Sequence, residues 1–248
     1  MKIIKYLICI IIVVFTLILT VSATNTISYI DSTSSNAGYF SVFYEDTFKP
    51  KMKIGIKYNN HTTYYDYIPN EQMQYSFSNG EGKYYIYLYK NVFGCKYKII
   101  ESKSVNVVLD NVLSPYLVSV YNISFYQDDL ITQTAQNLCT DCKTEQEKVL
   151  TIHKYIKDNI SYDYDLANSI IKNDITSYIP KAENTLVNKK GICYDTASLF
   201  AAMCRSQNIP CDIVRGYYKG VAHAWNKVYI TNKWYQIDVG LPLSKSIK

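Results

Sequence analysis

Three residues in the second half of the chain carry side chains that can act together in covalent catalysis: Cys193, His223 and Asp238. A thiol can attack a carbonyl carbon, an imidazole can accept and return a proton, and a carboxylate can orient the imidazole. Taken singly, each has an ordinary structural explanation, since a buried Cys is usually a small hydrophobe. Taken together and in this order, they indicate an acyl-transfer site.

The segment around Cys193 predicts a thiol at the start of a buried helix. Gly191 precedes it, and an apolar run from Leu199 to Cys204 lies within a helix expected over 194–204. Unpaired N–H groups and the positive end of the helix dipole favour thiolate there, so we expect a lowered pKa for Cys193. The same N–H groups can receive a developing oxyanion.

The segments after this helix read as three strands, at 211–218, 222–230 and 233–238. His223 and Trp225 lie on one side of the second strand because side chains alternate. A turn at Thr231 and Asn232 then sets Asp238 opposite Trp225 and diagonal to His223 on the same face. A slip of one residue would move the carboxylate to the other face, so the register decides whether the site can form.

Upstream of Cys193, apolar residues at helical spacing predict two helices. The first covers 129–138, and the second begins at a capping box that runs from Thr144 to Glu147. The apolar face of the second helix consists of Val149, Ile152, Ile156 and Ile160. The stretch 166–190 reads as polar and irregular.

From 27 to 115 the sequence is rich in short Tyr, Val, Ile and Phe segments that predict strands at 37–44, 51–58, 83–89 and 104–109. Turn residues separate them at Asn59-Asn60, Pro69-Asn70, Asn79-Gly80 and Asn91 to Gly94. Strands without intervening helices predict a small antiparallel sandwich. Its tyrosines could line a glycan-binding surface, but a half-buried pleated sheet explains them better.

The N-terminus has the features of an export signal. A charged start from Met1 to Lys5 is followed by an apolar stretch over 6–21 and by Val21-Ser22-Ala23, a small-residue cleavage site. We therefore interpret 1–23 as a signal peptide, which is nearly long enough to remain as an anchor if it is not cut. The expected location is secreted or cell-envelope associated.

Charge and cysteine content exclude several classes of protein. Of the net charge of +5, Lys2 and Lys5 supply two, and the remainder is too weak to indicate nucleic-acid binding. Beyond Cys9, six cysteines in a chain of this length are not a disulfide-dense scaffold. Cys139 and Cys142 have redox or half-zinc spacing, but no second pair completes a metal site. We therefore expect packed or incidentally paired thiols.

The segments around the three candidate residues resemble the core of the bacterial transglutaminase-like superfamily, which shares a papain-like arrangement. The similar segments are Gly191-Ile-Cys-Tyr-Asp-Thr-Ala197, Arg205 to Pro210, Val214-Arg-Gly216, His223-Ala-Trp-Asn-Lys-Val228, Trp234 and Asp238. The resemblance covers about 130–240 and includes 147–153 and 159–163. It implies an α+β fold, with a transglutaminase-like domain over 125–248 preceded by an all-β sandwich domain over 27–115.

The resemblance also implies roles: Cys193 as nucleophile, His223 as general base and Asp238 as orienting carboxylate. The family's reactions are acyl transfers through a thioester, namely crosslinking, deamidation or peptide cleavage. No cofactor is implied, and no loop has dense carboxylates at calcium-ligand spacing, so we expect no metal. The side-chain oxyanion donor has three candidates: Tyr162, Tyr164 and Trp225.

The three candidate residues determine neither the substrate nor the second nucleophile. The shape of the cleft and its desolvation decide between water and an amine. We expect protein or peptide substrates, cell-wall peptides among them, with membrane contact only through an uncut N-terminal segment. The alternative is a non-catalytic envelope-binding or assembly module that keeps the fold. That module would still associate with the envelope after Cys193→Ala and would lose the association without 27–115. The short tail after Asp238 is expected to leave the site exposed or the last strand poorly held.

Overall fold

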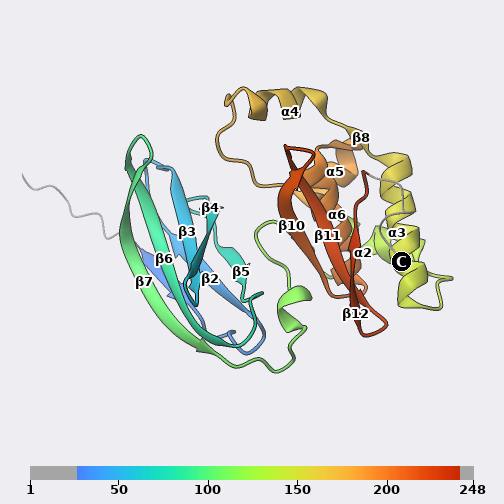
Figure 1. Ribbon diagram of the computed structural model, residues 1–248, viewed down its shortest axis with the longest axis horizontal. Coiled ribbons are helices and arrows are strands. Elements are labelled where there is room, and N and C mark those ends of the chain that lie inside the picture. The colour runs from blue at the N-terminus through green and yellow to red at the C-terminus, as the bar shows by residue number, and fades with distance from the viewer. Residues whose placement is uncertain (1–26, 241–248) are drawn as a thin grey trace, which may run out of the picture.

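The computed structural model describes residues 27–240, so the predicted signal peptide and the tail beyond 240 lie outside the described residues. Two hydrophobic cores organise the described chain: one in a β region (residues 27–113) and one in an α/β region (residues 114–240). Figure 1 shows the two regions side by side. Domain boundaries at 115 and 125 stay a prediction. Within 27–240, no helix is long and apolar enough to span a bilayer.

The β region consists of two antiparallel sheets, ordered β1-β2-β5 and β4-β3-β6-β7. Their strands are β1 Ser28–Asp31, β2 Tyr39–Tyr44, β3 Met52–Tyr58, β4 His61–Tyr67, β5 Met73–Ser76, β6 Gly82–Phe93 and β7 Lys96–Val107. Buried side chains from both sheets form one core, which includes Phe40 and Val42 from one sheet and Ile54 and Ile86 from the other. The predicted antiparallel sandwich is therefore confirmed.

The four strands expected from the sequence correspond to β2, β3, β6 and β7. Asn59 and Asn70 adopt positive φ angles of 52° and 69°, as expected at chain reversals. Strands β1, β4 and β5 were not predicted from the sequence. In β4 only Tyr67 is buried, so the strand shows no alternation of apolar and polar residues.

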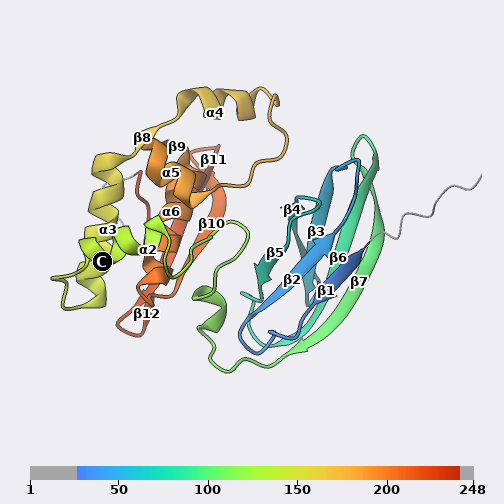
Figure 2. The ribbon, with the colours of Figure 1, turned by 180° about the vertical axis from the view of Figure 1, so that it is seen from behind.

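The α/β region contains a three-stranded antiparallel sheet in the order β10-β11-β12 and a two-stranded parallel sheet, β8-β9. Its elements are the 3-10 helix η1 Ser114–Tyr116, α2 Leu130–Leu138, α3 Glu145–Asn159, β8 Ser161–Tyr162, α4 Tyr164–Ile171, α5 Ala182–Asn188, β9 Lys190–Gly191, α6 Cys193–Ser206, β10 Cys211–Tyr218, β11 Val221–Ile230 and β12 Lys233–Ile237. Seen from front and back, α2, α5 and α6 cover one face of the β10–β12 sheet (Figures 1 and 2).

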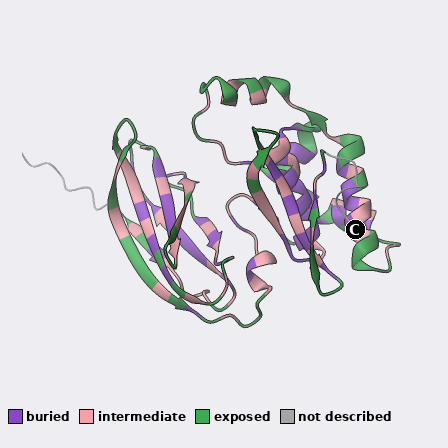
Figure 3. Ribbon diagram, in the orientation of Figure 1, coloured by how far each residue is buried: buried purple, intermediate pink, exposed green. Residues whose placement is uncertain are grey.

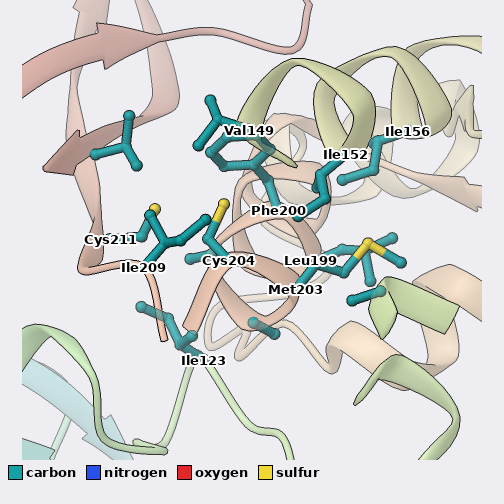
Figure 4. Close-up of a cluster of buried hydrophobic side chains, with 14 of the residues drawn as sticks. Ile123, Val149, Ile152, Ile156, Leu199, Phe200, Met203, Cys204, Ile209 and Cys211 are labelled. Atoms are coloured by element: carbon teal, nitrogen blue, oxygen red, sulfur yellow. The ribbon is translucent and has the colours of Figure 1, made fainter. Parts of the chain in front are cut away.

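Helix α6 passes through the centre of the second core. All residues from Leu199 to Cys204 are fully buried, as the apolar run predicts, and Figure 3 shows buried residues of α6 in purple behind the β10–β12 sheet. Figure 4 shows Leu199 and Phe200 of α6 beside Ile152 and Ile156 of α3. Because α6 is enclosed on all sides, its first residue is held in a fixed position relative to the sheet.

Both predicted helices upstream are confirmed, together with their caps. The side chain of Asp129 accepts from the Thr132 N–H at the start of α2, and Thr144 and Glu147 form the expected capping box of α3. The interpretation of 166–190 as irregular is wrong, because α4 and α5 lie there. Both helices have eight residues or fewer, too few for a periodic pattern to identify them.

Candidate active site

Cys193 is the first residue of α6, as predicted, and Ile192 is its extended N-cap residue. The backbone N–H of Ile192 donates to Asp195 Oδ2 over 2.8 Å. The hydroxyl of Tyr178 donates to the other oxygen of Asp195 over 2.7 Å, and Asp195 itself is only 2% exposed. A buried carboxylate thus holds the turn that presents the thiol.

This turn requires a glycine at position 191, because the structure leaves no room there for a side chain. A Cβ on Gly191 would lie 2.6 Å from the Cβ of Asp195 and 3.2 Å from Thr185 Cγ2. Gly191 also pairs with Tyr162 in the parallel β8–β9 ladder. The Gly-Ile-Cys sequence therefore brings β8 next to the start of α6.

The hairpin that carries the other two candidates has the predicted register. Thr231 and Asn232 have positive φ angles of 50° and 63°, and Asn226 pairs with Ile237. Asp238 is the residue immediately after β12 rather than its last residue. Its Oδ2 lies 2.6 Å from His223 Nε2, so the expected pair is formed.

This pairing determines the tautomer of His223. A carboxylate is acceptor-only, so Nε2 carries the hydrogen and donates it to Asp238 Oδ2. Nδ1 is then the ring nitrogen that can accept a proton. The ring also packs against Trp225, with centroids 6.0 Å apart and planes at 24°, which restricts its rotation.

Asp238 is itself held by two further contacts. Its Oδ1 accepts from the Gly240 N–H over 2.9 Å, and its carbonyl oxygen lies 3.3 Å from Nε2 of His153. His153 is 1% exposed, and burial lowers its pKa, so the ring is neutral and donates through Nε2. His153 was not among the site residues predicted from the sequence. The available signal is its position on the buried face of α3, next to Ile152.

Cys193 and His223 line the same cavity, whose volume is about 630 Å³. Its other lining residues include Tyr162, Tyr164, Thr196, Tyr218, Lys219 and Val221. The fold therefore brings the three sequence-predicted residues together: the thiol and imidazole share a cavity, and the imidazole is bonded to the carboxylate.

Residues 132–239 match the transglutaminase-like superfamily. The α/β region belongs to this superfamily. Its transglutaminase-like core (residues 132–239) contains all three candidate residues and supports a cysteine-dependent enzyme at the level of the superfamily. No curated protein matches the chain significantly.

Several solved structures are similar to the chain. A TGase is 25% identical, with a TM-score of 0.37, and the match covers 46% of this chain and 31% of that one. A candidate cysteine protease from Cytophaga hutchinsonii is 20% identical over 85% of this chain and 82% of its own, with a TM-score of 0.47. The periplasmic domain of TgpA from Pseudomonas aeruginosa is 13% identical over 82% and 69%, with a TM-score of 0.40. The chain thus spans about a third of the TGase.

The expectation of a lowered Cys193 pKa in the transglutaminase-like core is wrong. Burial raises the pKa of the thiol, and the carboxylates of Asp238 and Asp195 act in the same direction. Backbone N–H groups of Ala224 and Tyr194 favour the thiolate, but they do not offset the rise in the pKa of Cys193. The helix start is too enclosed for its dipole to overcome desolvation, so the resting nucleophile is a neutral thiol.

The structure distinguishes the three side chains of the core that were candidates for donating a hydrogen bond to the oxyanion. Trp225 donates its Nε1–H to Gln236 Oε1 over 3.1 Å and does not line the cavity. Tyr162 lines it, and its pKa is raised by burial and by its proximity to the Cys193 side chain. Tyr164 lines it too, but is 71% exposed against 46% for Tyr162. Tyr162 is therefore the favoured side-chain donor.

The other cysteines of the transglutaminase-like core lie away from this cavity. Within 27–240 all cysteines are free thiols, and Cys139, Cys204 and Cys211 are buried in the hydrophobic core. In the same part of the chain, no three His, Cys, Asp or Glu side chains converge as metal ligands would. The candidate chemistry therefore rests on one cysteine, Cys193.

Proposed function

We propose that this protein is an exported cysteine-dependent acyl-transfer enzyme, which forms a thioester with the acyl group of a protein or cell-envelope peptide amide. The observation that carries the proposal is the position of Cys193 at the start of α6, in one cavity with an imidazole whose Nε2 is bonded to Asp238. The predicted export signal supports a location in the envelope or outside the cell.

In the acylation step, His223 Nδ1 takes the thiol proton as the sulfur of Cys193 attacks the amide carbonyl. The new C–S bond forms, and the carbonyl electron pair moves onto oxygen. The backbone N–H groups at the start of α6 and the hydroxyl of Tyr162 stabilise that oxyanion. The C–N bond then breaks, and the His223 imidazolium gives its proton to the departing amine or ammonia.

The thioester is consumed by a second nucleophile. His223 Nδ1 takes a proton from water or from a primary amine as it attacks the thioester carbonyl, and the C–S bond breaks. The thiolate of Cys193 recovers the proton from the imidazolium. With water the net reaction is hydrolysis, either deamidation or peptide cleavage, and with an amine it is crosslinking.

The cavity supports a peptide-like substrate. It is lined by aromatic and aliphatic side chains, including Tyr162, Tyr164, Tyr218 and Val221, and its volume of about 630 Å³ accommodates an amide side chain with its neighbouring residues. The exposed cation Lys219 also lines it. The aromatic and aliphatic groups suit an uncharged amide.

The test is incubation of the purified protein with a Gln-containing peptide and a labelled primary amine, followed by mass spectrometry. We expect a covalent acyl adduct on Cys193 and a peptide product that shows amine incorporation, deamidation or cleavage. Cys193→Ala should form neither. Cys95→Ala is the matched control, because Cys95 is an exposed thiol of the β region. Product formation by Cys193→Ala at the wild-type rate would refute the assignment.

A further inference from the structure

A second cavity, of about 570 Å³, lies between the β region and the α/β region. Strands β3, β4 and β5 contribute one wall, with Tyr65 and Tyr75 among its residues, and β10 contributes the opposite wall, with Arg215. Tyr121, from the segment between η1 and α2, also lines it. The catalytic cycle described above uses none of these residues.

Two cations line this cavity, Arg215 and Lys227, and Lys227 is paired with Asp212. The guanidinium of Arg215 lies over the ring of Tyr65 at 5.6 Å and over that of Tyr194 at 5.8 Å, so an aromatic ring from each region holds it in place. Arg215 is exposed, and within residues 27–240 no carboxylate lies within 4.0 Å of it. Contacts with aromatic rings leave the N–H groups of a guanidinium available for a ligand.

The balance of charge around the cavity favours an anion. Asp212 also lines it, but this carboxylate is already paired with Lys227 at 3.4 Å and with the buried Arg205 at 3.7 Å. The nearby Asp66 is paired with Lys53 at 2.8 Å. The unpaired charge is therefore that of Arg215. Its planar guanidinium group can donate two parallel hydrogen bonds to a carboxylate.

This cavity adjoins the catalytic one. Ala222 lines both of them. Tyr194, which holds the guanidinium, directly follows Cys193 in the chain. In the β10–β11 ladder Arg215 is paired with Ala224, the neighbour of His223. One extended peptide can thus pass around the β10–β11 hairpin, next to Ala222, and occupy both cavities.

We propose that the cavity between the two regions is a binding site for a carboxylate of the substrate peptide, which Arg215 recognises. The inference rests on the proposed function and narrows its substrate class to peptides that present a free carboxylate. The carboxylate comes either from the peptide's C-terminus or from an acidic side chain, since both present the same planar group.

The test measures binding to the full chain carrying Cys193→Ala, so that no turnover occurs. Four fluorescent pentapeptides share a central Gln and differ at the last residue: Glu with a free terminus, Glu amide, Gln with a free terminus and Gln amide. By fluorescence anisotropy we expect at least one charged peptide to bind about tenfold more tightly than the neutral Gln amide, and the two singly charged peptides identify the source of the carboxylate.

Added in the same background, Arg215→Gln should abolish the preference for charged peptides. Arg215→Lys should retain part of it, because an ammonium group keeps the positive charge but not the bidentate geometry of the guanidinium. Lys83→Gln is the matched control, since Lys83 is an exposed cation over the Tyr85 ring of the β region, 5.2 Å from its centroid. It should leave the preference unchanged. Thermal melts verify that each variant is folded.

Equal affinities for the charged and neutral peptides would overturn the proposal. An Arg215→Gln variant that melts at a lower temperature yet still prefers the charged peptides would also overturn it. Arg215 would then stabilise the contact between the two regions without binding the ligand. Since binding is measured without the nucleophile, its outcome is separate from that of the thioester experiment. If the peptides bind with a carboxylate preference but no acyl adduct forms on Cys193 in the thioester experiment, the carboxylate site stands and the proposed function is refuted.

Discussion

His223 Nε2 and Asp238 Oδ2 lie 2.6 Å apart, although Asp238 stands just beyond the last residue of β12. The carboxylate keeps this position because the Gly240 N–H binds its other oxygen and His153 lies against its carbonyl group. The imidazole is thereby held in the tautomer that leaves Nδ1 as the proton acceptor.

Asp238→Asn should reduce acylation of the Gln-containing peptide by roughly 10²–10⁴-fold, because an amide does not enforce the Nε2–H tautomer or stabilise an imidazolium. The measurement is the rate of adduct formation on Cys193 by mass spectrometry. Asp158→Asn is the control, since Asp158 is an exposed residue of α3 paired with Lys154. A full rate in Asp238→Asn would show that the pair has no catalytic role.

Alkylation of Cys193 by iodoacetamide should have its pH midpoint above the ordinary thiol value of about 8.5, because burial and two carboxylates oppose the thiolate. Asp238→Asn removes one of these carboxylates, so it should move the midpoint to lower pH. The rate of labelling at each pH, followed by peptide mapping, gives the profile. A wild-type midpoint at or below pH 7 would contradict the neutral resting thiol.

Protonation of His153 should destabilise the fold. Burial lowers its pKa in the folded chain, so the unfolded chain binds more protons as the pH falls through the ordinary value of about 6.5. The free energy of unfolding in urea should therefore fall between pH 7.5 and pH 5, and less so in His153→Gln, whose amide still donates to Asp238.

The control for this experiment is His61→Gln, because His61 is exposed on β4. It should show the same pH dependence as the wild type. An identical loss of stability in wild type and His153→Gln would mean that other groups account for the acid sensitivity.

Tyr162→Phe should lower the acylation rate by about 10²-fold, as expected when one donor to the oxyanion is lost. Tyr164→Phe is the matched control, because the two rings pack edge to face with centroids 4.9 Å apart and both line the cavity. It should retain most of the activity. If the two variants lose the same activity, the Tyr162 hydroxyl is not a specific donor.

Elements defined by local chemistry were predictable from the sequence. The capping box of α3, the start of α6 at Cys193 and the turn at Thr231-Asn232 all depend on residues close together in the chain. Elements whose stability comes from distant partners were missed. Helix α5 buries Leu186 in the core around α6, and β5 forms by pairing with β2, where Met73 lies opposite Val42.

The sequence by itself therefore determined which residues form the candidate site and the register that makes it possible, because helix starts and tight hairpins are local structures. Only the tertiary structure decided the protonation state of Cys193, the support that His153 gives to Asp238 and the choice of Tyr162. Each of these depends on burial and on contacts between segments far apart in the chain, which no local pattern encodes. The cavity around Arg215 has the same origin, since its walls come from both regions.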